Sequence, residues 1–262
     1  MRVVDLDRDM RDVIPTGTSR DSEFLFERMT ECTLAAASER GRRVLDVASG
    51  FGQDSRQLAG QGAFAVAAEP SARMSALARM QEEGSAPRAV HVRAWGDALP
   101  FADGSFDAVF CKGAIDHFDT PLAAIGEMAR VTRPDGRVVL AIANFESLSC
   151  RVARGLDGLR ERWLGRTPAR GRRHYDVPHD HFTRYELGLM REQASAHLRI
   201  EAVWGLSLAW GLPGWSRTVS RLPESVAQAA LLAFDRMARV LPSLADVVVL
   251  SGRPRRAATT SA

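Results

Sequence analysis

The chain has 262 residues, 45% of them hydrophobic, which is enough to bury a large core. Its 35 basic residues are interspersed with 32 acidic ones, and the small net charge of +3 favours a solvated surface and argues against nucleic acid as a partner. The cysteines, Cys32, Cys111 and Cys150, have neither zinc-site nor disulfide spacing, so we expect a reducing, cytoplasmic location and no metal site. The charged first ten residues lead us to expect no signal peptide.

In chain order, the first strong signal is a helix over residues 22–40, followed by the most informative segment of the sequence. Residues 44–47 form an apolar run typical of a parallel strand covered on both faces. Gly50 and Gly52 come next and allow a tight turn that brings the backbone close to a ligand. Residues 53–59 can then begin a helix whose first amides point at that ligand. Together, these features predict a nucleotide-like ligand.

Two kinds of nucleotide site compete for this segment. A dinucleotide fingerprint of the form G-x-G-x-x-G requires a third glycine, where this chain has Ser55. The pattern Asp46-x-Ala48-x-Gly50-x-Gly52 instead resembles motif I of the class I S-adenosylmethionine (SAM)-dependent methyltransferases. The family usually has glycine where Ala48 stands. The resemblance is to the small-molecule type, with a methyltransferase-11-like core.

The resemblance continues in order for about a hundred residues. Residues 64–69 read as a second strand that ends in Glu69, whose carboxylate would accept the ribose hydroxyls of the adenosine. Residues 89–95 read as a third strand, and Gly96 and Asp97 after it resemble the family's adenine-binding turn. The spacing from Asp97 to residues 99–101 is about two residues shorter than the family leads us to expect. Residues 105–111 and 133–140 resemble the fourth strand and the turn into the fifth.

The resemblance implies SAM as cofactor and a Rossmann-like α/β fold, with a seven-stranded, mostly parallel sheet, helices on both faces and a helical insertion before the last strand. Taken alone, a strand-end carboxylate such as Asp46 or Glu69 could merely cap a neighbouring helix. The lysine that follows the fourth strand lies where this class places substrate and cofactor side by side. The expected cofactor-binding residues are Asp46, Ala48, Ser49, Gly50, Gly52, Glu69, Pro70, Gly96, Asp97, Ala98 and Lys112.

The C-terminal part predicts more helices and two further strands. Helical spacing covers residues 145–164, and residues 183–197 form a second helix with Thr183 as its expected N-cap. Strands are expected at 199–204 and 246–250, with the residues from 251 on unstructured. Between these strands, a tryptophan-containing segment and a helix at 223–240 are expected to shape an acceptor pocket or a dimer face. We expect no membrane-spanning segment there, because glycines and Pro213 interrupt an apolar run too short to cross a bilayer.

We expect a single catalytic domain that consists of five consecutive segments. These are an N-terminal helical cap at 1–40, a SAM-binding core at 41–144, a helical and loop acceptor region at 145–198, C-terminal strands with a helical insertion at 199–254, and a disordered tail at 255–262.

Two histidines are candidates for a general base. His117 follows the fourth strand, where small-molecule members of the family often carry a histidine, and His181 lies in a second polar segment. Either residue could instead be a hydrogen-bonded structural histidine. A metal site is a further alternative for the second segment, since imidazole and carboxylate groups suit zinc or iron. That site would use His174, Asp176, His179 and His181.

The sequence therefore favours SAM-dependent methyl transfer to a small-molecule acceptor, in secondary metabolism or on a lipid-like or sugar acceptor, by in-line displacement. A homodimer is compatible with this hypothesis. A non-catalytic SAM- or nucleotide-binding regulatory protein and an NAD(P)-dependent oxidoreductase are the alternatives.

Overall fold

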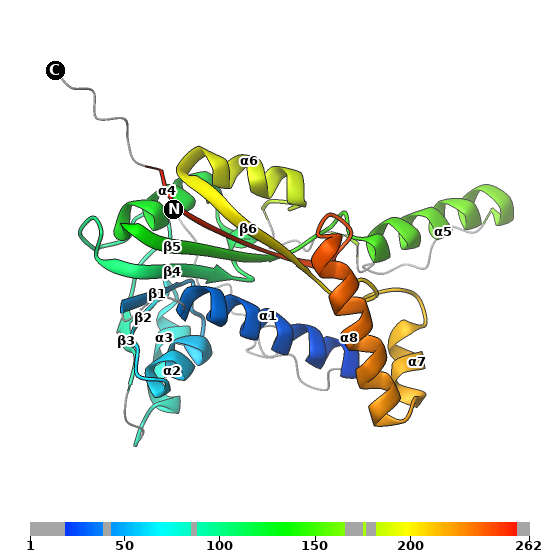
Figure 1. Ribbon diagram of the computed structural model, residues 1–262, viewed down its shortest axis with the longest axis horizontal. Coiled ribbons are helices and arrows are strands. Elements are labelled where there is room, and N and C mark those ends of the chain that lie inside the picture. The colour runs from blue at the N-terminus through cyan, green and yellow to red at the C-terminus, as the bar shows by residue number, and fades with distance from the viewer. Residues whose placement is uncertain (1–18, 39–42, 85–87, 166–174, 177–181, 256–262) are drawn as a thin grey trace.

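The computed structural model describes residues 19–38, 43–84, 88–165, 175–176 and 182–255, and Figure 1 shows their arrangement. Seven strands form one sheet in the order β3-β2-β1-β4-β5-β7-β6. The strands from β3 to β5 run parallel, and β7 runs antiparallel to both of its neighbours. The strands are β1 (Arg43–Val47), β2 (Phe64–Ala68), β3 (Val90–Val92), β4 (Phe106–Lys112), β5 (Thr132–Ala143), β6 (Leu198–Leu206) and β7 (Val247–Pro254).

Helices cover both faces of this sheet (Figure 1). Two helices, α7 and α8, lie between β6 and β7 in the chain. The helices are α1 (Arg20–Ser38), α2 (Gln53–Gly60), α3 (Ala72–Gln81), α4 (Pro121–Val131), α5 (Leu148–Leu164), α6 (Leu187–His197), α7 (Trp215–Arg221) and α8 (Glu224–Val240), with a 3-10 turn η2 (Ile115–His117) after β4.

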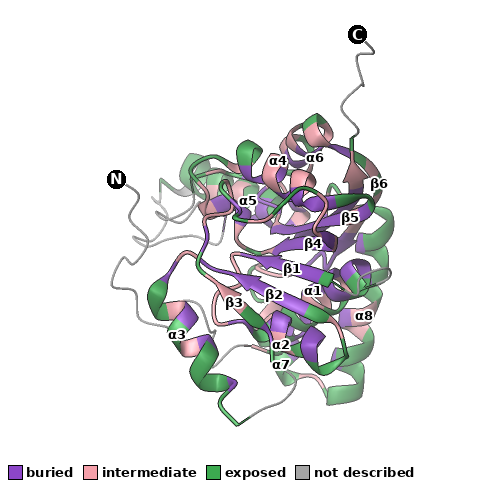
Figure 2. Ribbon diagram, turned by 90° about the vertical axis from the view of Figure 1, so that its left-hand side faces the viewer, coloured by how far each residue is buried: buried purple, intermediate pink, exposed green. Residues whose placement is uncertain are grey.

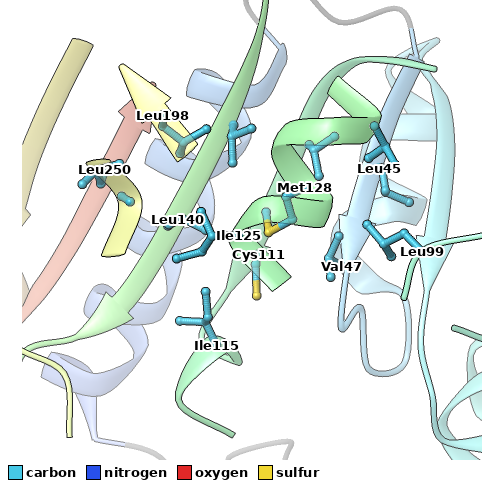
Figure 3. Close-up of a cluster of buried hydrophobic side chains, with 14 of the residues drawn as sticks. Leu45, Val47, Leu99, Cys111, Ile115, Ile125, Met128, Leu140, Leu198 and Leu250 are labelled. Carbon is cyan, nitrogen blue, oxygen red and sulfur yellow. The ribbon is translucent and has the colours of Figure 1, made fainter. Parts of the chain in front are cut away.

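The alternation of side chains along the central strands divides the core between the two faces. Leu45 and Val47 of β1 point to one face, where they belong to the core that includes residues of α4 and α6. Val44 points to the other face, where the core includes residues of α1 and α2. The central strands are buried on both faces (Figure 2), as apolar parallel strands usually are. Figure 3 shows the first core, where side chains from β1, β4, β5 and α4 converge.

The predicted α/β fold with seven mostly parallel strands is confirmed, and each predicted strand is present in its expected place. Three local expectations were wrong. The third strand covers only Val90–Val92. Helix α6 begins after Glu186 rather than at Thr183. Residues 251–254, expected to be unstructured, belong to β7 because they pair with β5 and β6.

The division into a cap, core, acceptor region and insertion stays a prediction. The expected tail lies outside the described residues except for Arg255. Within the described part of the chain, no helix is long and apolar enough to cross a lipid bilayer.

Candidate functional site

The candidate site lies where the order of the strands reverses. From β1 the chain moves outward to β2 and β3, and it then returns to the other side of β1 as β4. In open α/β sheets, ligands bind at this switch point, at the carboxyl ends of the strands. The loop of residues 48–52 follows β1 and the expected Lys112 ends the neighbouring strand β4, so these two segments lie at the same edge of the sheet.

The loop after β1 depends on three residues with left-handed backbone conformations. Gly50 and Gly52 have φ values of 56° and 72°, which glycine adopts without steric cost. Ala48 has φ of 58°, in a region that costs a residue with a Cβ about 1 to 2 kcal/mol. The amides of Ala48 and Ser49 both donate to the Ala68 carbonyl, at 2.8 and 3.2 Å, and hold the strained loop against the end of β2.

Glu69 links this loop to the next helix. Its side chain is nearly buried, and its Oε2 accepts the Gly50 amide at 2.9 Å. Its Oε1 accepts the Ser71 amide, also at 2.9 Å, just before α3 begins. The carboxylate is therefore fixed beside the glycine loop, where the resemblance places the ribose.

Asp46 lies on the opposite face of β1 from Leu45 and Val47, beneath the start of α2. Ser55 donates its hydroxyl to Asp46 Oδ2 at 2.8 Å. Burial, and then the nearby Asp54 carboxylate, raise the pKa of Asp46 to about 8. Asp46 thus fixes the first turn of α2 through Ser55. The expected contact of Asp46 with the cofactor stays a prediction.

Lys112 ends β4, and its ammonium group is held by two neighbouring helices. Nζ donates to Thr30 Oγ1 of α1 at 2.7 Å and forms an ion pair with Asp54 of α2 at 2.6 Å. The two side chains are 22% and 8% exposed, so water screens the pair only weakly. Lys112 therefore joins β4, α1 and α2, and its expected cofactor contact stays a prediction.

The expected adenine turn is closed by residues that follow η2. The Phe118 ring packs over Gly96 so closely that a Cβ at residue 96 would collide with it. Asp97 Oδ2 accepts the Thr120 hydroxyl at 2.5 Å, and the Ala98 amide donates to the Trp95 carbonyl at 3.1 Å. These contacts fix the turn between β3 and β4 against the start of α4.

Pro70 lies at the edge of the same site. Its carbonyl accepts a hydrogen bond from Arg93 at 3.0 Å, which joins the end of β2 to the chain after β3.

One polar group of the glycine loop indicates that a ligand binds here. Ser49 Oγ is buried and has no hydrogen-bond partner among the described residues. Buried hydroxyls are almost always paired, so an orphaned one marks a place where a polar ligand fits. Together with the open backbone of Gly50, whose added Cβ would meet only the tip of Met74 at 3.4 Å, this fits the SAM that the resemblance implies.

On the side where the acceptor is expected, the residue before His117 contacts the residues that follow His181. His117 is 37% exposed, and its Nε2 lies 3.9 Å from Oδ1 of the buried Asp116. The Asp116 carbonyl accepts the amides of Phe182 and Thr183 at 2.8 and 3.2 Å. The chain immediately after His181 is therefore anchored beside His117.

His181 itself, with His174 and His179, lies outside the described residues, and Asp176 is described as half-buried. Across the residues that the structure describes, there is no cluster of three or more potential metal ligands.

Sequence reasoning missed several residues that shape the site. His91 pairs with Glu82 at 3.0 Å, and a Cβ at Gly52 would lie 3.0 Å from His91 Cε1. Phe118 and Thr120 were also missed. Gly96 was the one hint in the sequence, because a glycine in a loop often marks a close approach by another group.

Comparison with known proteins agrees with this geometry. Residues 45–140 match the family model described as a methyltransferase domain. A demethylmenaquinone methyltransferase from Beutenbergia cavernae is 41% identical over 132 residues, which cover 50% of each protein. One of the same name from Mycobacterium sp. (strain KMS) is 37% identical over 131 residues, covering 49% of this chain and 53% of that protein. The chain thus spans about half the length of these curated relatives.

Solved structures share the fold over most of the chain. The PH0226 protein from Pyrococcus horikoshii OT3 aligns with a TM-score of 0.60 at 17% identity, covering 95% of this chain and 99% of that one. The [4+2]-cyclase SpnF aligns with a TM-score of 0.55 at 18% identity, covering 87% and 80%. Residues 45–140 thus match a methyltransferase domain, and the chain shares the Rossmann-like fold of these solved structures.

Proposed function

We propose that the protein is an enzyme that transfers the methyl group of SAM to a small-molecule acceptor. The observation that carries the proposal is the pair of hydrogen bonds that Glu69 accepts from the Gly50 and Ser71 amides, which we call the Glu69 clamp. It holds a carboxylate beside a glycine turn at the switch point of the sheet. The methyltransferase-domain match over residues 45–140 includes this clamp. A cytoplasmic location, as the cysteine pattern predicts, is part of the proposal.

We infer that the acceptor is a flat apolar ring of the quinone type. The relatives named demethylmenaquinone methyltransferase support this class of acceptor. Phe118, whose ring packs over Gly96, follows the candidate base in the chain, and the Phe182 amide donates to the carbonyl of the residue before that base. Aromatic side chains such as these can stack on a ring acceptor.

Bound SAM supplies an electrophilic methyl group on a sulfonium. Transfer of that methyl group by in-line displacement would depend mainly on how the acceptor is positioned. Glu69 and the glycine loop provide this positioning on the donor side. His117 accepts the proton that the acceptor loses, and the Asp116 carboxylate lies 3.9 Å from its Nε2.

A two-stage experiment tests this function. Thermal unfolding with S-adenosylhomocysteine or NADH should show a rise in Tm with the first compound alone, because only a ligand of the folded state stabilises it. Mass spectrometry should then detect methyl transfer from SAM to a ring-demethylated quinol. Protection by NADH instead would support an oxidoreductase. Protection by S-adenosylhomocysteine without methyl transfer to any acceptor in a broad panel would support a non-catalytic binding protein. This outcome has to be tested because the fold alone does not fix the activity: it also occurs in a [4+2]-cyclase.

A further inference from the structure

Helix α5 carries an exposed apolar stripe and extends away from the body of the protein (Figure 1). Its buried side is short, with Cys150 and Ala153 packed against Tyr175. On another side, four apolar residues recur at intervals of four, three and four, which places them along one face. They are Val152, Leu156, Leu159 and Trp163, and they are 38%, 38%, 55% and 77% exposed.

Arginines border this stripe. At about 100° per residue, Arg160 lies on one side of the stripe and Arg151 and Arg162 lie on the other. The two acidic residues of the helix, Asp157 and Glu161, fall on the side away from the stripe. Positive charge therefore borders the apolar face on both sides, with Arg160 paired to Asp157 at 3.4 Å and Arg151 paired to Glu146 at 3.6 Å.

The surrounding sequence concentrates this positive charge further. Residues 148–173 contain eight arginines and two acidic residues, a net charge of +6. The whole chain carries +3, so the rest of the chain carries a net −3. The helix and the chain that follows it thus form a basic segment in an otherwise acidic protein, which complements an anionic surface.

We propose that α5 docks on the surface of an anionic phospholipid bilayer. The stripe from Val152 to Trp163 is about 17 Å long at 1.5 Å per residue, so the helix lies in the interface and does not span it. Leu156, Leu159 and Trp163 enter the boundary between headgroups and acyl chains, and the flanking arginines contact lipid phosphates. An apolar face with arginines on the polar side and a tryptophan near its end is the pattern of interfacial helices.

A second copy of the chain is a poorer occupant of the same face. Pairing two α5 helices along their stripes would bring the bordering arginines of both copies together, and like charges at close range oppose association. The inference does not rest on the proposed acceptor, because it concerns only α5 and the lipid surface.

Vesicle sedimentation of the full chain tests the proposal. We expect binding to vesicles that mix phosphatidylcholine with phosphatidylglycerol, weak binding to phosphatidylcholine alone, and loss of binding as salt is raised. Leu159→Glu should weaken binding at least tenfold, because it places a charge in the apolar boundary. Met80→Glu on α3 is the matched control: Met80 is 68% exposed and lies on a helix at the opposite end of the molecule (Figure 1), so this variant should bind like the wild type.

The charge requirement is tested separately. Arg160→Gln combined with Arg162→Gln should lower affinity for the phosphatidylglycerol vesicles roughly tenfold or more. The exposed pair Arg217 and Arg221 of α7, changed to glutamine in the same way, should leave affinity unchanged.

Each remaining outcome overturns the proposal. These outcomes are absence of vesicle binding by the wild type, equal binding to both lipid compositions, or unchanged binding of Leu159→Glu with its fold verified by circular dichroism. Sedimentation without vesicles that Leu159→Glu abolishes would show self-association through α5 instead. As a second readout, the wild-type tryptophan emission should shift to the blue on vesicles, and Trp163→Phe should remove that shift.

Discussion

Glu69 accepts the amide of Gly50 with one carboxylate oxygen and the amide of Ser71 with the other, each at 2.9 Å. One side chain therefore fixes the ligand-binding turn after β1 and the start of the helix after β2. Because both contacts lie at the expected ligand-binding turn, loss of the carboxylate should weaken ligand binding.

The first prediction concerns this clamp. Glu69→Ala should weaken S-adenosylhomocysteine binding by about 1.5 to 3 kcal/mol, the scale of hydrogen bonds to a charged group. Isothermal titration calorimetry measures the change, and the exposed Glu83→Ala should bind like the wild type. An unchanged affinity in folded Glu69→Ala would remove Glu69 from the cofactor site. Gly50→Val should bind more weakly still, because a branched side chain strains a residue at φ of 56° and enters the ligand's space.

The second prediction separates a structural from a cofactor role for Lys112. Lys112→Gln leaves the nearly buried Asp54 carboxylate without its cation, so we expect a loss of about 2 to 4 kcal/mol in the free energy of unfolding. The double variant with Asp54→Asn should recover most of this loss, since no uncompensated charge remains.

Urea unfolding of the four proteins in this cycle measures the coupling. Two additive single losses would show that the ion pair does not stabilise the fold. A large loss of S-adenosylhomocysteine affinity with little change in stability would instead support Lys112 as a cofactor-binding residue.

Much of the fold could be predicted because its signals are local. The apolar run of residues 44–47, followed by glycines at a turn, depends only on adjacent residues. The contacts that complete the site are different. Phe118 packs over Gly96 and Thr120 binds Asp97 across more than twenty residues, and a single sequence does not identify the partner in such pairs.

The start of α6 shows how a long-range contact overrides a local signal. The capping-box spacing predicted an N-cap at Thr183. The Thr183 amide instead donates to the Asp116 carbonyl at 3.2 Å, so the chain at this point is held against the loop after β4. The helix therefore begins at Leu187, one turn later.

The third prediction tests the strain at Ala48. Ala48→Gly should be at least as stable as the wild type, because relief of the left-handed conformation offsets the greater freedom of glycine in the unfolded chain. Ala76→Gly, at an exposed position in α3 with helical geometry, should lose about 1 kcal/mol. Equal losses in the two variants, measured by urea unfolding, would show that the φ of residue 48 stores no strain.

The fourth prediction concerns catalysis. If His117 is the general base, His117→Ala should lower turnover by roughly 10²- to 10⁴-fold with nearly unchanged S-adenosylhomocysteine affinity. Acidification should slow the wild type, since only neutral imidazole accepts a proton, and should not slow the residual activity of the variant. Turnover near the wild-type value at every pH would make His117 structural, and His181→Ala would then be the variant to measure.

The last prediction uses a buried carboxylate at the junction of three segments. Asp246, just before β7, accepts the Ser149 hydroxyl of α5 at 2.5 Å and the Trp210 amide at 2.8 Å. Burial raises the pKa of Asp246 to about 6, although these hydrogen bonds oppose the rise. The folded state therefore favours the protonated carboxyl, and this contribution to stability is present below the unfolded pKa of about 4 and is lost as pH rises through 6.

Between pH 4 and pH 7, the loss from this group amounts to about 2 to 3 kcal/mol. Asp246→Asn should remove it, because an amide does not titrate and can still accept from Trp210 while donating to Ser149. Urea unfolding at both pH values should therefore show a smaller fall in stability for Asp246→Asn than for the wild type, with the exposed Asp135→Asn as control. Parallel pH dependences of the wild type and Asp246→Asn would show that burial at this junction does not favour the protonated carboxyl.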